Sequence, residues 1–135
     1  MTQNEKDLLL KDLCARLPYG VKVQSYGYED GVETIETLSA IDSDGYMSTL
    51  ECETLKPIAK PYLFPLSSMT EEQKKEYNYQ KHIIPVCRYA YGDVVEEDEL
   101  IDSPASFEYL IENNFDCRGL IPMGLAIDAT GLNIY

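Results

Sequence analysis

The residues with the spacing closest to that of a known metal site lie in one short acidic segment. Asp42-Ser43-Asp44-Gly45 precedes Glu51, and with Gly45 at the sixth position of a calcium loop, Glu51 is at the twelfth. The first ligand position would then be Ala40, whose side chain has no oxygen. The flanking residues are typical of strands, whereas an EF-hand needs helices. The segment is therefore predicted to be a hairpin turn, and no metal is assigned to the chain.

The positions of the cysteines and the histidine in the sequence give little support for a metal site or a cysteine nucleophile. No pair among the four cysteines has CxxC spacing: Cys14, Cys52, Cys87 and Cys117. A cysteine nucleophile would need the single histidine, His82, with Cys87 nearest in sequence, and nearness in sequence does not establish that geometry. The polar start of the chain lacks the basic and apolar regions of a secretory signal. We therefore predict reduced, buried cysteines.

No other catalytic signature is present in the sequence. The glycine patterns of dinucleotide sites, P-loops and serine hydrolases are all missing. With 24 Asp and Glu residues, carboxylate pairs are too numerous to identify an acid and a base. No catalytic or cofactor-binding residue is assigned, and the sequence leans against an enzyme.

Net charge restricts the partners most strongly. The chain has 24 acidic residues against 11 Lys and Arg, a formal net charge of -13 over 135 residues. A nucleic-acid backbone or an anionic membrane would be repelled, so neither is an expected partner. No apolar run approaches the roughly 20 residues that span a bilayer. We expect a cytoplasmic protein whose acidity serves either a basic protein partner or solubility alone.

The acidic run Glu96-Glu97-Asp98-Glu99 is the candidate partner-binding site. It lies in the segment 92–102, which is predicted to be a loop. In one interpretation the loop is simply solvated and places negative charge before the N-terminus of the next helix. In the other, the four residues form a recognition surface for Lys and Arg of a partner. The sequence leaves both interpretations open.

Three helices are predicted, two amphipathic and one polar. Thr2 and Glu5 form a capping pair. An apolar stripe at helical spacing follows them: Leu9, Leu10, Leu13, Cys14 and Leu17. The second helix, over 71–79, is polar nearly all round and should lie on the surface. In the third, Ser103 and Pro104 match the N-cap and N1 preferences, and a docking face follows: Phe107, Leu110 and Ile111.

The strand pattern indicates an antiparallel meander over 21–24, 32–41 and 46–52. Three prolines make 55–66 an extended connector, and Pro85 places a strand over 82–91 at an edge. The fold class is therefore α+β in a single domain, 1–135: an antiparallel sheet of three to five strands, with the two amphipathic helices packed on one face and a polar surface helix. Six side chains should be buried: Leu9, Leu13, Leu50, Phe107, Leu110 and Ile111.

Three stretches carry a resemblance to a known group: KDLCARLPYG at 11–20, PYLFPLSSMTEE at 61–72 and RGLIPMGLA at 118–126. They resemble a family of small uncharacterised proteins from gut bacteria of the Bacteroidales type, often associated with phage or integrated elements. This family has no assigned activity, so the resemblance implies no catalytic residue. It implies an intracellular, phage-related setting and favours an accessory role.

These observations predict a small acidic, non-enzymatic interaction or accessory protein. The expected partner is a basic protein, and the expected contact is the run 96–99. Two alternatives stay open: a small hydrolase-type enzyme with an unrecognised carboxylate site, and a self-assembling structural module. A pocket with convergent carboxylates would favour the first alternative, and a large exposed apolar patch would favour the second.

Overall fold

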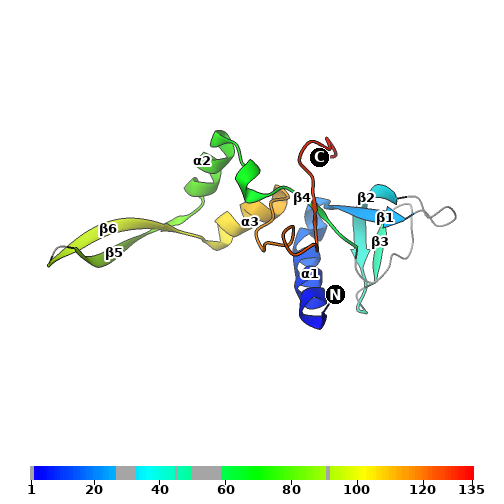
Figure 1. Cartoon of the computed structure of the whole chain (residues 1–135), viewed down its shortest axis with the longest axis horizontal. Coiled ribbons are helices and arrows are strands. Elements are labelled where there is room, and N and C mark those ends of the chain that lie inside the picture. Colours follow the sequence, from blue (N-terminus) through cyan, green and yellow to red (C-terminus); the bar gives the residue numbers. More distant parts are fainter. Residues whose placement is uncertain (1, 27–32, 45, 50–58, 91) are drawn as a thin grey trace. The chain divides into compact units, whose positions relative to one another are not determined.

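The computed structural model describes residues 2–26, 33–44, 46–49, 59–90 and 92–135. These residues form an α+β structure with three α-helices, whose largest antiparallel sheet has three strands (Figure 1). The chain divides into two compact units: unit 1 is Met1–Ser68 with Ile111–Tyr135, and unit 2 is Met69–Leu110. The elements follow in chain order: α1 (Gln3–Arg16), η1 (Leu17–Tyr19), β1 (Lys22–Tyr26), β2 (Glu33–Ile41), β3 (Met47–Thr49), β4 (Tyr62–Leu63), η2 (Leu66–Ser68), α2 (Glu71–Tyr79), β5 (His82–Ala90), β6 (Asp93–Ile101), α3 (Pro104–Glu112) and β7 (Ile127–Asp128).

The first helix of unit 1, α1, begins as its capping residues predict. The Thr2 hydroxyl accepts a hydrogen bond from the Glu5 amide at 3.2 Å. The buried face of α1 has helical spacing but mixed chemistry: Leu9, Asp12, Leu13 and Arg16. Cys14, predicted to belong to a buried stripe, is exposed. The reason is that it lies one residue, about 100° of helix rotation, beyond Leu13.

The sheet of unit 1 is the predicted antiparallel meander, in the order β1-β2-β3. The segment after β2 is the predicted hairpin turn. The Asp42 Oδ1 atom accepts hydrogen bonds from the amides of Asp44 and Tyr46, both at 2.9 Å. The Asp42 amide in turn donates to the Tyr46 carbonyl at 2.9 Å. The carboxylate therefore closes a turn, while the predicted turn at 29–31 and residue Glu51 lie outside the described residues.

A short strand, β4, replaces part of the predicted proline connector. It pairs in parallel with β7, through Tyr62 with Ile127 and Leu63 with Asp128. Pro61, just before β4, forms an isolated antiparallel bridge with Val23 of β1. Proline is tolerated there because it starts the strand and needs to donate no ladder hydrogen bond. The connector therefore has neighbours on both sides, which its prolines did not predict.

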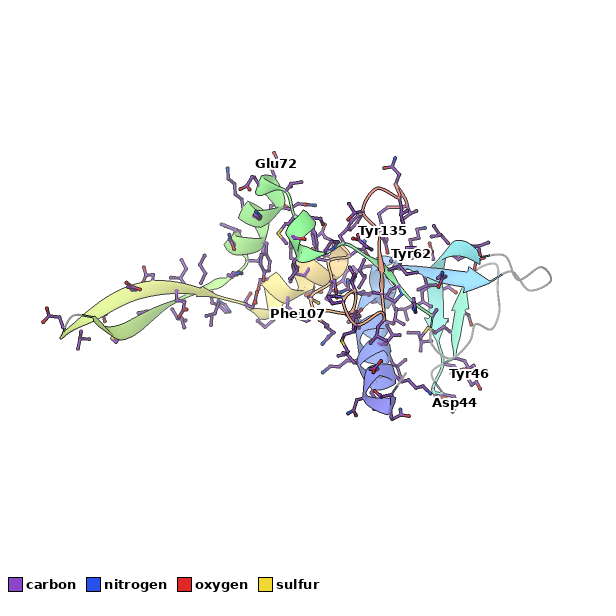
Figure 2. The ribbon with its side chains drawn as sticks, viewed as in Figure 1. Asp44, Tyr46, Tyr62, Glu72, Phe107 and Tyr135 are labelled. Carbon is purple, nitrogen blue, oxygen red and sulfur yellow. The ribbon has the colours of Figure 1, made fainter. Side chains whose placement is uncertain are left out.

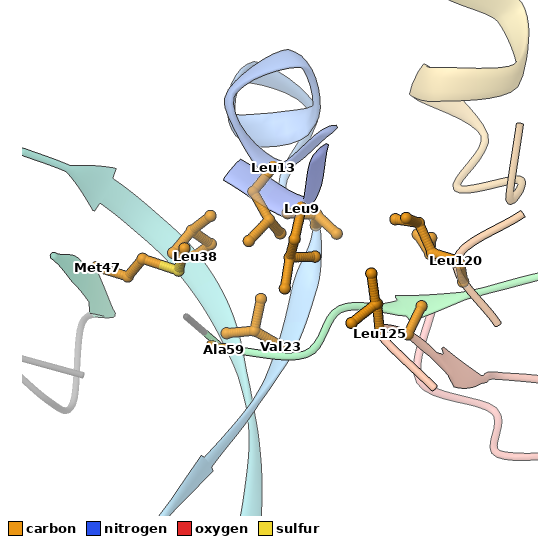
Figure 3. Close-up of a cluster of buried hydrophobic side chains, with 11 residues drawn as sticks. Leu9, Leu13, Val23, Leu38, Met47, Ala59, Leu120 and Leu125 are labelled. Atoms are coloured by element: carbon orange, nitrogen blue, oxygen red, sulfur yellow. The ribbon is translucent and has the colours of Figure 1, made fainter. Parts of the chain in front are cut away.

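The apolar core of unit 1 is one cluster of side chains from α1, the meander, residues 59–63 and residues 120–126 (Figure 3). Its members are Leu9, Leu13, Val21, Val23, Leu38, Met47, Ala59, Leu63, Leu120, Leu125 and Ala126. Of the side chains predicted to be buried, Leu9, Leu13, Leu110 and Ile111 are buried and Phe107 is half-buried. Leu50 lies outside the described residues.

Unit 2 contains α2, the hairpin of β5 and β6, and the start of α3. Thr70 and Gln73 form a capping box at the start of α2, which buries none of its residues, as predicted for a polar surface helix. The predicted loop over 92–102 was wrong, because most of that segment is strand β6. Gly92 directly precedes β6, and its φ of 86° is the left-handed conformation that glycine adopts without strain. Pairing with β5 then outweighs the low strand preference of Glu and Asp.

The N-cap of α3 is confirmed. The Ser103 Oγ atom accepts a hydrogen bond from the Ser106 amide at 3.0 Å. In return, the Ser106 hydroxyl accepts one from the Ser103 amide at 2.7 Å. The two serines therefore satisfy each other's backbone donors, in the manner of a capping box.

Candidate functional site

The acidic run 96–99 lies in the middle of β6, and all four of its side chains are exposed. Because side chains alternate along a strand, Glu96 and Asp98 point to one face of the hairpin and Glu97 and Glu99 to the other. Asp93 is also acidic, and no residue of β6 is basic. We call Glu96, Glu97, Asp98 and Glu99 the acidic surface of β6. It presents negative charge on both faces of one strand.

The direct cross-strand partners of these four residues are uncharged. The register pairs them in order with Cys87, Val86, Pro85 and Ile84 of β5. In one of these pairs, the Cys87 Sγ and Glu96 Oε1 atoms are 4.0 Å apart. Opposite charges placed directly across a ladder would stabilise a hairpin. This register places no opposite charge directly across from the acidic run.

Large apolar side chains are also exposed on the hairpin. The exposed fractions are 67% for Ile83, 59% for Val94, 47% for Leu100 and 38% for Ile101. In the described part of the chain, β5 and β6 form a sheet of two strands only. Side chains project from both faces of this ribbon (Figure 2). Such a ribbon has little apolar burial of its own and is marginal in water.

Hydrogen bonds and a ring contact hold the base of the hairpin and the helices of unit 2 together. The Tyr77 hydroxyl donates to the Asp102 carboxylate, and the Ser103 hydroxyl donates to the Gln80 carbonyl. The rings of Tyr77 and Tyr109 stack with centroids 6.3 Å apart. These contacts order the base of the hairpin while most of its length extends from α2 (Figure 1).

The candidate cysteine nucleophile is not assembled in β5. His82 and Cys87 are five residues apart on one strand, so they point to opposite faces. At about 3.3 Å per residue they are also roughly 16 Å apart along the strand. His82 is paired with Ile101, not with an acid that could orient it. Cys14, Cys87 and Cys117 are free thiols, and both Cys14 and Cys87 are exposed, contrary to the prediction of buried cysteines.

A second charged cluster, in unit 1, was missed by the sequence analysis. Arg16 and Asp12 are both fully buried, with the Arg16 Nε and Asp12 Oδ2 atoms 2.7 Å apart. The other oxygen, Asp12 Oδ1, accepts a hydrogen bond from Arg118 Nε at 3.1 Å. Arg16 also donates to the carbonyls of Phe115, at 2.6 Å, and Ile111, at 3.4 Å. The only sequence signal was the i, i+4 spacing of Asp12 and Arg16 on a helix.

This ionic cluster is suited to holding the fold of unit 1. The Arg16 guanidinium joins α1 to backbone carbonyls in the last turn of α3 and just after it, and it also bonds to Asp12. The Cys117 Sγ atom lies 3.6 Å from Arg16 Nη2. Burial nevertheless raises the pKa of the Cys117 thiol, and this effect exceeds the opposing effect of Arg16. The thiol stays protonated, so this arrangement does not activate a nucleophile.

The described residues offer no metal site and no membrane-spanning helix. Among the described residues, no group of three or more His, Cys, Asp and Glu could hold a metal ion. None of the described helices combines the length and apolarity that crossing a membrane requires. No known family model, curated protein or solved structure matches the chain.

Proposed function

We propose that this chain is a small non-enzymatic accessory protein that binds a basic protein through the acidic surface of β6. The observation that carries the proposal is the exposed run of four acids whose direct cross-strand partners are all uncharged. In unit 1, by contrast, the fully buried Asp12 lies within hydrogen-bonding distance of two arginines. This contrast between exposed and buried acids supports a contact of β6 with a basic partner.

The net charge of the chain supports the same proposal. A formal charge of -13 on 135 residues creates a negative field that attracts a basic surface and increases the rate of encounter. Salt screens this field within about 8 Å at physiological ionic strength, so the four acids must lie close to the contact. A concentrated run on one strand meets that requirement better than acids dispersed over the surface.

Several expectations from the sequence accompany this proposal. The resemblance to a family associated with phage or integrated elements supports an accessory role in a cytoplasmic setting. The packing of both amphipathic helices on one face of a single sheet also stays a prediction. The alternatives, a hydrolase-type enzyme and a self-assembling module, are the proposals to revisit if binding fails.

Association kinetics with an oligolysine peptide test the proposal. The variant Glu96→Lys, Glu97→Lys, Asp98→Lys and Glu99→Lys should associate several-fold more slowly than the unchanged chain at low salt, and moderate salt should narrow the difference. A matched control reverses four exposed acids elsewhere: Asp7, Asp44, Glu72 and Glu112. It changes the net charge equally and should slow association much less. Equal slowing by the two variants would leave the acidity as a solubility feature.

A further inference from the structure

We infer that β6 binds its partner by strand addition: an extended segment, basic at its centre and apolar at its ends, pairs with the free edge of β6. This inference rests on the proposed function and specifies the partner's conformation. It makes the hairpin the nucleus of a sheet that the partner completes. Recognition then has two parts, backbone hydrogen bonds along the strand and charge pairs beside it.

The free edge of β6 is the structural basis. Within the described residues, β6 pairs with β5 and with no other strand. In an antiparallel ladder every second residue directs its N–H and C=O groups away from its partner strand. β6 is nine residues long and contains neither proline nor glycine. Among the described residues, no strand pairs with the row of backbone donors and acceptors along its outer side.

The other edge of the hairpin is less suitable. Pro85 lies near the middle of β5 and is exposed. Proline has no amide hydrogen and interrupts strand pairing, a common means of protecting an edge. β6 contains no proline, and at its centre it carries acidic residues instead. Charge repels other acidic strands, but it attracts a basic one.

A second copy of this chain is a poor occupant. Two β6 strands in antiparallel register about the centre of the acidic run would place the run 96–99 of one copy against the same run of the other. Like charges directly opposite destabilise a ladder. A basic segment reverses the sign of every one of these interactions. Charge complementarity therefore selects a Lys- or Arg-rich strand over self-association.

The apolar residues of β6 define the ends of the partner segment. Val94 and Leu100 lie on the same face as Glu96 and Asp98, one on each side of the acidic run. Both are highly exposed, at 59% and 47%. A partner with apolar residues at both ends would cover these side chains and remove that surface from water. The matching segment is apolar at each end and basic in between.

The test uses two peptides as long as β6, with consecutive lysines at the centre and valines at both ends. One has an ordinary backbone, and the other is N-methylated at every backbone nitrogen. Methylation keeps the side chains and charges but removes the N–H donors. Fluorescence anisotropy measures binding of each peptide to the unchanged chain, to the β6 reversal variant and to the matched control variant. The methylated peptide should bind about tenfold more weakly or worse, because it loses several backbone hydrogen bonds.

The outcomes separate the two proposals. Weaker binding of the methylated peptide, together with weaker binding of the ordinary peptide to the β6 reversal variant, supports strand addition. Equal affinity of the two peptides overturns strand addition, while the proposed function survives if the β6 reversal variant still binds both more weakly. Equal affinity of the ordinary peptide for the β6 reversal and matched control variants overturns both. The test of strand addition compares the ordinary and methylated peptides on the unchanged protein, so it does not depend on the folding of any variant.

Discussion

The charged residues of this chain occur in two contrasting settings. In unit 1, Asp12 and Arg16 are fully buried and form an ion pair with atoms 2.7 Å apart. In unit 2, the acidic surface of β6 is exposed and lies opposite uncharged residues. A carboxylate in the first setting replaces its water with protein donors, whereas one in the second stays in water. Burial, and not residue type, therefore separates the acids that hold the fold from those that can meet a partner.

Removing a buried charge should lower the stability of the protein more than removing an exposed one. A buried ion pair need not stabilise a protein relative to a well-packed apolar replacement, but breaking one by removing a single partner leaves a buried charge uncompensated. Substituting an exposed acid should change the stability of the protein little, because water solvates both the original and the new side chain. Substitutions in the two settings should therefore differ in how much they lower the free energy of unfolding.

Asp12→Asn should produce the largest loss of stability. Asparagine keeps the shape of the side chain but leaves the fully buried Arg16 guanidinium without its carboxylate. The free energy of unfolding should fall by about 3–5 kcal/mol, measured by urea denaturation. Glu72→Gln, on the exposed side chain of Glu72 in α2, is the matched control and should change stability by less than about 0.5 kcal/mol. Similar effects of the two substitutions would abolish the contrast between buried and exposed acids.

Tyr135→Phe extends the comparison to a polar group of unit 1 outside the ionic cluster. The Tyr135 hydroxyl donates to the Tyr62 carbonyl at 2.7 Å and accepts from the Lys22 amide at 2.9 Å. Losing these two contacts should cost about 1–2 kcal/mol near neutral pH. Burial of the phenol raises the pKa of Tyr135 from 10.0 to about 12, although 45% of the residue's surface is exposed. Burial outweighs the hydrogen bond from the Lys22 amide and the charge of Arg16, both of which act to lower the pKa of Tyr135.

The stability lost in Tyr135→Phe should depend on pH, and the raised pKa of Tyr135 sets the direction. In the unfolded chain Tyr135 ionises near its ordinary pKa of 10.0, whereas in the folded chain it stays neutral until about 12. Its contribution is therefore complete below about pH 10 and is lost as the pH rises toward about 12. Urea unfolding of the two proteins at about pH 8 and about pH 11 should show a smaller difference at the higher pH. A constant difference would mean that the hydroxyl is not protected in the fold.

Ser103→Ala tests a polar contact in unit 2. The serine caps α3, and its hydroxyl donates to the carbonyl of Gln80 at the end of α2. We expect a loss on the order of 1 kcal/mol in the free energy of unfolding, measured by urea denaturation. Ser67→Ala, at an exposed position in η2, is the control and should have little effect. An unchanged midpoint for Ser103→Ala would show that the first turn of α3 needs no side-chain cap.

The β6 reversal variant should show the smallest effect on stability. Its four substitutions are exposed, and their cross-strand partners carry no charge, so no direct cross-strand charge pair is broken. The free energy of unfolding should change by about 1 kcal/mol or less. Thermal unfolding measures this directly. A loss comparable with that of Asp12→Asn would place the acids of β6 among the groups that hold the fold.

Local patterns in the sequence predicted much of the fold. The caps of Thr2 and Ser103, the polar second helix and the meander each depend on a few neighbouring residues. Local patterns failed where pairing with another segment of the chain determines the structure. Strand β6 forms although Glu and Asp disfavour strands, because nine consecutive pairs with β5 stabilise it. Strand β4 forms beside prolines because β7, more than sixty residues later, pairs with it.

The charged sites show the same division. The run 96–99 was visible because its residues are adjacent, but its strand conformation and its uncharged partners depend on the register with β5. The ionic cluster was invisible because Arg118 is 106 residues from Asp12 along the chain. The i, i+4 spacing of Asp12 and Arg16 also fits a solvated pair on a helix surface. Only the packing of α1 shows that this pair is buried.

Amide hydrogen exchange of β6, with and without the peptide of central lysines, tests the role of the acidic strand most directly. In the free chain, the outward amides of β6 should exchange rapidly, because the described structure places no strand beside them. With the ordinary peptide bound, exchange at alternate residues of β6 should slow by about tenfold or more, while that of β1, β2 and β3 should not change. Unchanged exchange in β6 at saturating peptide, or slowing confined to unit 1, would contradict the assignment of β6 as the binding strand.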